Sequence, residues 1–319
     1  MSDLLAAARN AVSYCLKVQA GESVLVVSDP GTAAVGTALW QAARESGAEA
    51  LFLQMQARHM HGEEPPAPVA AAMVNSQVCF LVTSKSLSHT RARREATAAG
   101  ARIASLPGIS EAAMIRTLQA DYGAIEALSR RLAEVLTRGR LAEIIGPGGS
   151  RLTFGLDSRI GQVDGGLYWE KGAFGNLPAG EAYIAPLEGT AAGKLVVDGS
   201  IAGIGRLEEP LTLEFAEGYL RGIYGGRQAR QLEEILQPYG PEARNLAELG
   251  IGTNEKAILT GSPLEDEKIK GSLHVALGAN ANFGGIVEVP LHLDAIVLKP
   301  TLLIDGQVII SQGQLRLGE

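Results

Sequence analysis

The sequence predicts an N-terminal doubly wound parallel α/β domain over residues 1–143, followed by a mainly antiparallel, β-rich domain over residues 144–319. Three observations support this division. Strand-like and helix-like patterns alternate in the first part, short strand-like runs with glycine turns dominate the second part, and a turn-rich segment lies between them. A length of 319 residues is sufficient for two domains.

The first domain is expected to begin with a helix over residues 3–18, where Leu4, Ala8, Val12 and Cys15 recur at near-helical spacing. Strands and helices then alternate, which predicts a parallel sheet with helices on both faces. The expected strands cover 22–28, 49–55, 78–84 and 101–107, with a helix over 32–46. The segment 58–68, which contains His59 and His61, is predicted to be a long solvated loop.

An amphipathic helix over 122–139 and the turn-rich segment I-G-P-G-G-S at 145–150 mark the expected end of the first domain. The runs that follow have the composition of antiparallel strands, and a helix is expected over 227–237. The chain closes with T-L-L-I-D-G-Q-V-I-I, which predicts a hairpin with Asp-Gly at its turn.

Composition excludes several classes of function. The net charge is −7, and R-A-R-R at 91–94 is the only basic cluster, so we expect no nucleic-acid partner. Cys15 and Cys79 lie in apolar surroundings and are expected to be buried thiols, not a disulfide. No apolar run reaches about 18 residues and no signal peptide stands out, so we expect a cytoplasmic protein without a membrane partner.

The segment P-L-H-L-D places His292 and Asp294 two residues apart. On a strand both side chains point to the same face, where an imidazole and a carboxylate can hold a divalent metal. His274 lies 18 positions earlier in another strand-like run, G-S-L-H-V-A-L-G. A strand with two satisfied polar groups, and a core histidine bonded to a carbonyl, are the simpler alternatives.

Two single acids occur in apolar runs and are candidates for the same site. Glu181 opens the run E-A-Y-I-A-P, and Glu248 lies in A-E-L-G; alternatively they are a solvated strand end and a surface acid at a helix C-terminus. With the two histidines and Asp294 they suit two metal ions about 3.5–4 Å apart, which is hydrolase chemistry. His274, His292 and Asp294 alone equally suit a facial triad for non-haem iron.

Other motifs are weaker. S-D-P-G-T at 28–32 is interpreted as a plain strand-to-helix turn, and L-E-D-E-K at 264–268 as a charged turn. No G-x-S-x-G motif is present and neither cysteine has an activating context, so the sequence gives no support for nucleophilic catalysis.

These motifs resemble the M29 family of metalloaminopeptidases, the aminopeptidase T group, from N-L-P-A-G-E at 176–181 to the end of the chain. The shared order continues through A-E-L-G-I-G-T-N, L-E-D-E-K-I-K-G-S-L-H-V-A-L-G and P-L-H-L-D. The resemblance implies a site for two zinc or cobalt ions, a peptide substrate and a homodimer. The implied metal ligands are Glu181, Glu248, His274, His292 and Asp294.

Two features differ from those aminopeptidases: the chain is shorter, and Ala281 lies near the place of their catalytic tyrosine. The length is closer to the related 2,5-dihydroxypyridine 5,6-dioxygenases, which use one iron(II) to open an aromatic ring. The chain retains both glutamates, as the peptidases do. Because the chemistry requires the ligands, whereas chain length varies with loops, we give the ligands more weight than length in choosing between the two families. We therefore expect an aminopeptidase in which Glu181 or Glu248 moves the proton, with a small-molecule dioxygenase and a non-enzymatic binding protein as alternatives.

Overall fold

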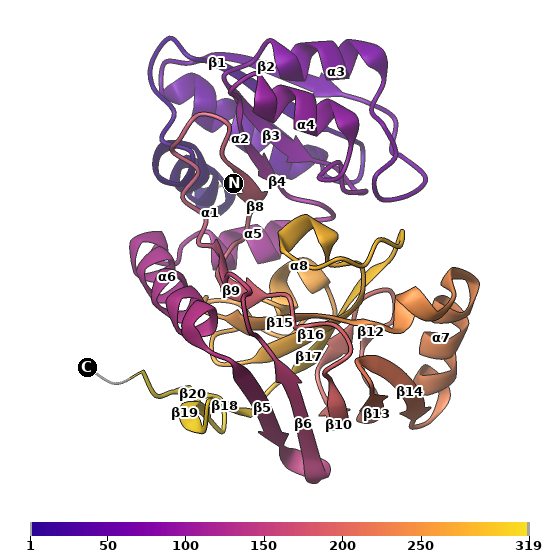
Figure 1. Cartoon of the computed structure of the whole chain (residues 1–319). Coiled ribbons are helices and arrows are strands. Elements are labelled where there is room, and N and C mark those ends of the chain that lie inside the picture. Colours follow the sequence, from indigo (N-terminus) through magenta and orange to yellow (C-terminus); the bar gives the residue numbers. More distant parts are fainter. Residues whose placement is uncertain (1, 318–319) are drawn as a thin grey trace. The chain divides into compact units, whose positions relative to one another are not determined.

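The computed structural model describes residues 2–317, and the chain forms two compact units (Figure 1). The first unit consists of residues up to 124 together with 166–179, and the second of 125–165 together with 180 onward. This division differs from the expected one at residues 143 and 144. The glycine-rich segment that suggested a boundary is instead a tight turn, η2 (Pro147–Gly149), inside the second unit.

The first unit contains a five-stranded sheet in the order β2-β1-β3-β4-β8, and every pairing in it is parallel. Its strands are β1 (Ser23–Ser28), β2 (Glu49–Gln54), β3 (Val78–Val82), β4 (Arg102–Ser105) and β8 (Phe174–Asn176). The four strands expected from the sequence are confirmed. The fifth strand, β8, belongs to the segment that returns from the second unit, and its three residues F-G-N carry no strand pattern.

Helices cover both faces of this sheet, as expected for a doubly wound domain. Leu25 and Val27 share a buried apolar cluster with residues of α3 and α4, while the alternate residues Val24 and Val26 are buried on the opposite face. The helical elements are α1 (Ser2–Asn10), the π-turn η1 (Ala11–Cys15), α2 (Ala33–Glu45), α3 (Ala67–Val74), α4 (Arg91–Ala98) and α5 (Glu111–Thr117). Both cysteines are fully buried, as predicted.

The second unit is built from two antiparallel sheets, which confirms the predicted β-rich class. The eight-stranded sheet has the order β14-β13-β10-β6-β5-β18-β19-β20. Its strands are β5 (Leu141–Gly146), β6 (Ser150–Gly155), β10 (Ala192–Val197), β13 (Leu211–Ala216), β14 (Tyr219–Tyr224), β18 (Thr301–Ile304), β19 (Gln307–Ser311) and β20 (Gln314–Leu315). The predicted Asp-Gly hairpin is confirmed, because Asp305 and Gly306 both have positive φ angles, as a type I′ turn requires.

The seven-stranded sheet has the order β12-β11-β17-β16-β15-β9-β7. Its strands are β7 (Gln162–Asp164), β9 (Glu181–Ile184), β11 (Ser200–Ile201), β12 (Gly205–Arg206), β15 (Leu246–Gly252), β16 (Leu273–Gly278) and β17 (His292–Val297). Helices α6 (Tyr122–Arg138), α7 (Arg227–Leu236) and α8 (Pro263–Asp266) and the short turns η3 (Gln237–Tyr239), η4 (Pro241–Arg244) and η5 (Ala281–Phe283) complete the elements.

One face of the seven-stranded sheet is buried in the largest apolar core of the second unit. Leu249, Val275 and Leu293 belong to this core and come from the three neighbouring strands β15, β16 and β17. Because side chains alternate along a strand, their sequence neighbours are directed to the other face of the sheet. In the described part of the chain, no helix is long and apolar enough to cross a membrane.

Candidate metal centre

The five candidate ligands lie on the face of the seven-stranded sheet opposite that core. They come from four strands that are neighbours in the sheet: β9, β15, β16 and β17. Glu248 is paired across the strands with Ala276, which is in turn paired with Asp294. His274 is directed to the same face as Ala276, and His292 to the same face as Asp294. The register of the sheet therefore gathers residues that are more than 100 positions apart.

Small residues leave space for the polar side chains on this face. Gly250 is the cross-strand partner of His274, and a Cβ atom at position 250 would lie 1.9 Å from His274 Nε2. Gly252 is paired with Glu181, and Gly278 with His292. The absence of a side chain at position 250 lets the His274 imidazole lie over the neighbouring strand.

Short distances join the five side chains in one chain of contacts. His274 Nε2 lies 3.3 Å from Glu181 Oε2 and 3.2 Å from Glu248 Oε1. His292 Nε2 lies 3.4 Å from Glu248 Oε2 and 3.4 Å from Asp294 Oδ1. Glu248 thus lies between the two imidazoles, with one oxygen facing each of them.

The donors form two groups in which the ligand atoms lie within 4.8 Å of one another. Glu181, Glu248 and His274 form the buried group, and Glu248, His292 and Asp294 form the more accessible one. The mixture of nitrogen and carboxylate donors suits zinc, cobalt or iron(II).

Two further observations fit a metal ion. His292 Nδ1 lies 2.9 Å from the Ala279 carbonyl oxygen, so it can donate its proton there and leave the Nε2 lone pair facing the acids. Among the residues that the structure describes, Glu181 Oε2 is buried without a hydrogen-bond partner. A buried carboxylate oxygen without a hydrogen bond is costly unless a cation binds it.

A buried lysine lies beside the five ligands. The Lys268 side chain is 0% exposed, and its Nζ lies 2.6 Å from Glu181 Oε1, 2.8 Å from Glu267 Oε1 and 3.3 Å from Asp164 Oδ2. The interpretation of residues 264–268 as a charged turn is therefore wrong, because all five are buried. Their charges are satisfied inside the protein; Asp266, for example, accepts hydrogen bonds from the backbone of Thr260 and Gly261.

The acids of the site outnumber the lysine. Asp164, Glu181 and Glu267 surround the single ammonium of Lys268, and Glu248 and Asp294 lie beside the two histidines. Without a metal ion, protons on the imidazoles supply part of the missing positive charge, and the pKa values reflect this.

Burial by itself lowers the pKa of His274, but the hydrogen bond to Glu248 and the charge of Glu181 outweigh it and raise the pKa to about 9. The pKa of His292 also rises well above its usual value, because Asp294 and Glu248 outweigh desolvation. Burial raises the pKa of Glu181 to about 8, although Lys268 opposes this rise. Burial would also raise the pKa of Glu248, but hydrogen bonds with the two histidines lower it to about 2.

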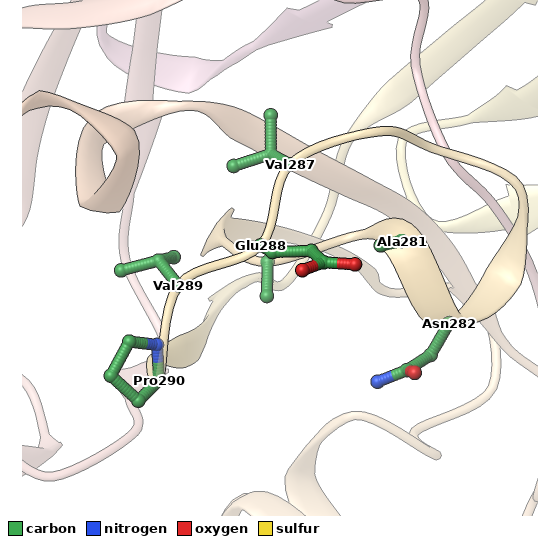
Figure 2. Close-up of a pocket in the computed structure, with 7 residues that line it drawn as sticks. Ala281, Asn282, Val287, Glu288, Val289 and Pro290 are labelled. Carbon is green, nitrogen blue, oxygen red and sulfur yellow. The ribbon is translucent and has the colours of Figure 1, made fainter.

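His292 is the exposed member of the centre, and aromatic rings lie next to it. The Phe283 ring makes edge-to-face contacts with His292, at a centroid distance of 5.9 Å, and with Tyr183, at 5.6 Å. Phe283 belongs to the connection between β16 and β17. The same connection lines an open pocket of about 360 Å³, shown in Figure 2, whose lining includes Glu288 and Pro290.

The structure thus brings together all five residues singled out from the sequence. Glu248 lies in a buried strand, not at a helix C-terminus. Sequence reasoning missed a second set of residues around the centre: Asp164, Tyr183, Glu267, Lys268 and Phe283. The four consecutive charges before the His274 strand were the available signal, and only the fold shows that they are buried.

The donor cluster is of a kind that can hold divalent metal ions. Residues 3–317 match the model of the 2,5-dihydroxypyridine 5,6-dioxygenase family, and the chain belongs to this family. A curated 2,5-dihydroxypyridine 5,6-dioxygenase from Pseudomonas putida KT2440 is 26% identical over 162 residues, which cover 45% of each chain. That match therefore spans about half the length of the relative.

Two solved structures share the fold. The 2,5-dihydroxypyridine dioxygenase from Pseudomonas putida KT2440 has a TM-score of 0.84 at 20% identity, covering 99% of this chain and 97% of that chain. Wild-type AmpT from Thermus thermophilus has a TM-score of 0.72 at 18% identity, covering 99% of both chains. The likeness to AmpT is one of fold alone. The specific family is that of the dioxygenases, not of the peptidases expected from the motifs.

Proposed function

We propose that this protein is an iron(II)-dependent dioxygenase that opens the ring of a hydroxylated nitrogen heteroaromatic compound of the 2,5-dihydroxypyridine class. The observation that carries the proposal is the family match over residues 3–317, because the ligand geometry alone is compatible with both oxygenase and hydrolase chemistry. This reading replaces aminopeptidase activity as the leading candidate.

His274, His292 and Asp294 would hold the iron, since they provide the two histidines and one carboxylate of a facial triad. Iron(II), when bound, supplies the one-electron chemistry that allows dioxygen to react with an aromatic ring. Glu248 lies between both imidazoles and keeps their Nε2 atoms directed to the same region. The Ala279 carbonyl fixes the tautomer of His292.

The substrate would approach from the exposed side of the centre, where His292 and Phe283 lie. The Phe283 ring offers an aromatic wall for a heteroaromatic substrate. Glu181 is the residue that we assign to proton transfer. Its Oε2 atom has no hydrogen bond, and burial raises its pKa to about 8, so this carboxyl group can exchange a proton with a substrate hydroxyl at a pH near 8.

A two-ion aminopeptidase is the second candidate, and one observation favours it. Glu248 belongs to both groups of donor atoms, which is the arrangement of a carboxylate that bridges two ions. In this case Glu181, Glu248, His274, His292 and Asp294 would hold the two ions, which would supply Lewis-acid chemistry for peptide hydrolysis, with Glu181 or Glu248 moving the proton.

Metal content and oxygen consumption test the proposal together. Protein purified without added metal is expected to contain one iron per chain and to consume oxygen with 2,5-dihydroxypyridine. His292→Ala and Asp294→Ala should lose both the metal and the activity, whereas His59→Ala, in the exposed loop of the first unit, should lose neither. Two zinc or cobalt ions per chain, with release of amino acids from peptides, would instead establish the second candidate.

The expected homodimer remains a prediction. Light scattering coupled to size-exclusion chromatography should give a mass near twice that of the 33.4 kDa chain. A mass of one chain at micromolar concentration would contradict it.

A further inference from the structure

We propose that Lys268 is a positioning residue of the metal centre: its ammonium holds Glu181 by Oε1, so that Oε2 is directed toward His274 at the edge of the centre. This inference rests on the metal centre of the proposed function, but not on the reaction carried out there.

The environment of Glu181 shows why such a residue is required. Asp164 on β7 is its direct cross-strand partner, and carboxylates directly opposite each other on neighbouring strands repel. Lys268 Nζ lies between these two acids, 2.6 Å from Glu181 and 3.3 Å from Asp164. The ammonium therefore converts a repulsive pair into an ion-paired cluster.

The two carboxylate oxygens of Glu181 have different partners. Oε1 accepts the short hydrogen bond from Lys268 Nζ. Oε2 has no hydrogen bond and lies 3.3 Å from His274 Nε2. A carboxylate held by one oxygen cannot rotate freely, so the other oxygen is fixed in direction toward the centre.

The lysine is itself fixed. Its side chain is fully buried, and Glu267 Oε1 lies 2.8 Å from Nζ. The backbone on both sides is bonded, because Lys268 N donates to the Glu265 carbonyl and the Lys268 carbonyl accepts from Asn254 N. Among the described residues, the Lys268 ammonium contacts the carboxylates of Asp164, Glu181 and Glu267 and none of the proposed iron ligands. Lys268 therefore acts on the metal through Glu181.

Charge and position predict opposite effects of removing the lysine. Loss of a positive charge near a cation site tightens cation binding by Coulomb attraction. Loss of the bond to Glu181 releases the acid that faces the ligand His274 and weakens binding; loss of such supporting bonds costs about 10–100-fold in metal affinity. Our proposal requires the second effect to dominate.

The test measures Co²⁺ affinity by titration calorimetry and the ligand set by the visible absorption of bound Co²⁺. Lys268→Met should weaken Co²⁺ binding about tenfold to a hundredfold and change the absorption bands. Lys268→Arg, which keeps the charge and the donors, should restore most of the affinity. Lys270→Met removes the same charge from an exposed lysine two residues away and should change neither measurement.

A double variant separates orientation from charge. Lys268→Met with Glu267→Gln removes one positive and one negative charge, so the net charge of the cluster stays constant. It should still bind Co²⁺ about tenfold or more weakly than wild type. The double variant can replace the single variant if the latter does not fold, because it leaves one fewer buried carboxylate without a cationic partner. Melting curves in EDTA show whether each variant is folded.

Wild-type affinity and unchanged absorption bands in the double variant would overturn the proposal. This outcome is distinct from failure of the proposed function. A wild-type protein that binds Co²⁺ but opens no aromatic ring would refute the reaction, whereas the affinity measurements decide the role of Lys268 whatever the reaction is.

Discussion

Individual residues of the centre have different roles although several share the same chemistry. Glu181 and Glu248 are both buried glutamates, yet the pKa of Glu181 is raised to about 8 and that of Glu248 is lowered to about 2. The difference arises from the neighbours, because Glu248 receives hydrogen bonds from two histidines while desolvation dominates at Glu181. Opposite shifts of this kind identify a proton-transfer candidate beside a permanent anion.

Metal binding should release protons, because the pKa of His274 is raised to about 9 in the metal-free protein. Below that pH the imidazole is protonated and must lose its proton to coordinate a metal. Affinity should therefore increase as the pH rises toward 9. Calorimetry at pH 7 in buffers with different ionisation enthalpies should show at least one proton released per ion; a heat independent of the buffer would contradict this.

Phe283 should affect substrate affinity more than metal binding. Its ring contacts Tyr183 and His292 but supplies no metal donor. An aromatic contact contributes about 0.5–1.5 kcal/mol, so Phe283→Ala should raise KM for an aromatic substrate roughly two- to tenfold. Metal content should remain that of wild type, and Phe283→Tyr, which keeps the ring, should have a KM near that of wild type. An unchanged KM in Phe283→Ala would place the substrate elsewhere.

At the scale of elements, the antiparallel register of β9, β15, β16 and β17 assembles the centre. One face of these strands packs in the apolar core, and the other carries the ligands. Gly250 on the same face is as important as the candidate ligands, because it leaves the space that the His274 imidazole occupies. The strands therefore fix the position of the site more firmly than loops would.

Gly250→Ala should displace His274 from the centre. The new Cβ atom would lie 1.9 Å from His274 Nε2, so the ring or the strand must move. We expect a loss of about 1–3 kcal/mol in the free energy of unfolding, together with weaker Co²⁺ binding. Gly155→Ala is the matched control, because its Cβ would meet Thr190 at an ordinary 3.5 Å. Equal metal affinity in both variants would show that His274 does not need this space.

At the scale of the whole molecule, the excess of buried acids links metal binding to folding in the second unit. The folded pKa of His274, about 9, lies above its usual 6.5, so its stabilising contribution is complete below pH 6.5 and is lost as pH rises through 9. The pKa of Glu181 is also raised, from 4.5 to about 8, so its contribution is likewise lost as pH rises through 8. The metal-free protein should therefore become less stable between pH 6.5 and 9.

Thermal melting with and without EDTA checks this prediction. The metal-free protein should have a lower Tm at pH 9 than at pH 6.5, while a bound divalent ion should remove most of the difference. At a metal concentration of 100 Kd the ion should add about 2.7 kcal/mol to the free energy of unfolding. A metal-free Tm that rises over this pH range would contradict the charges assigned here.

The sequence by itself predicted much of the first sheet, the last hairpin and the five candidate ligands. Alternation of patterns predicted four of the five parallel strands, and the Asp-Gly turn of the last hairpin is as expected, because these features depend on residues close together in the chain. His292 and Asp294 could be paired from their spacing alone, since a strand directs them to one face.

Only the tertiary structure decided which residues support those ligands. Lys268 and Glu267 have the composition of a surface turn, and Asp164 lies in a short strand 104 residues before Lys268; the fold buries all three around Glu181. The division between the units was also set by tertiary structure, because the segment 166–179 returns to pair with β4. Burial and strand pairing depend on contacts between distant segments, and no local pattern encodes such contacts.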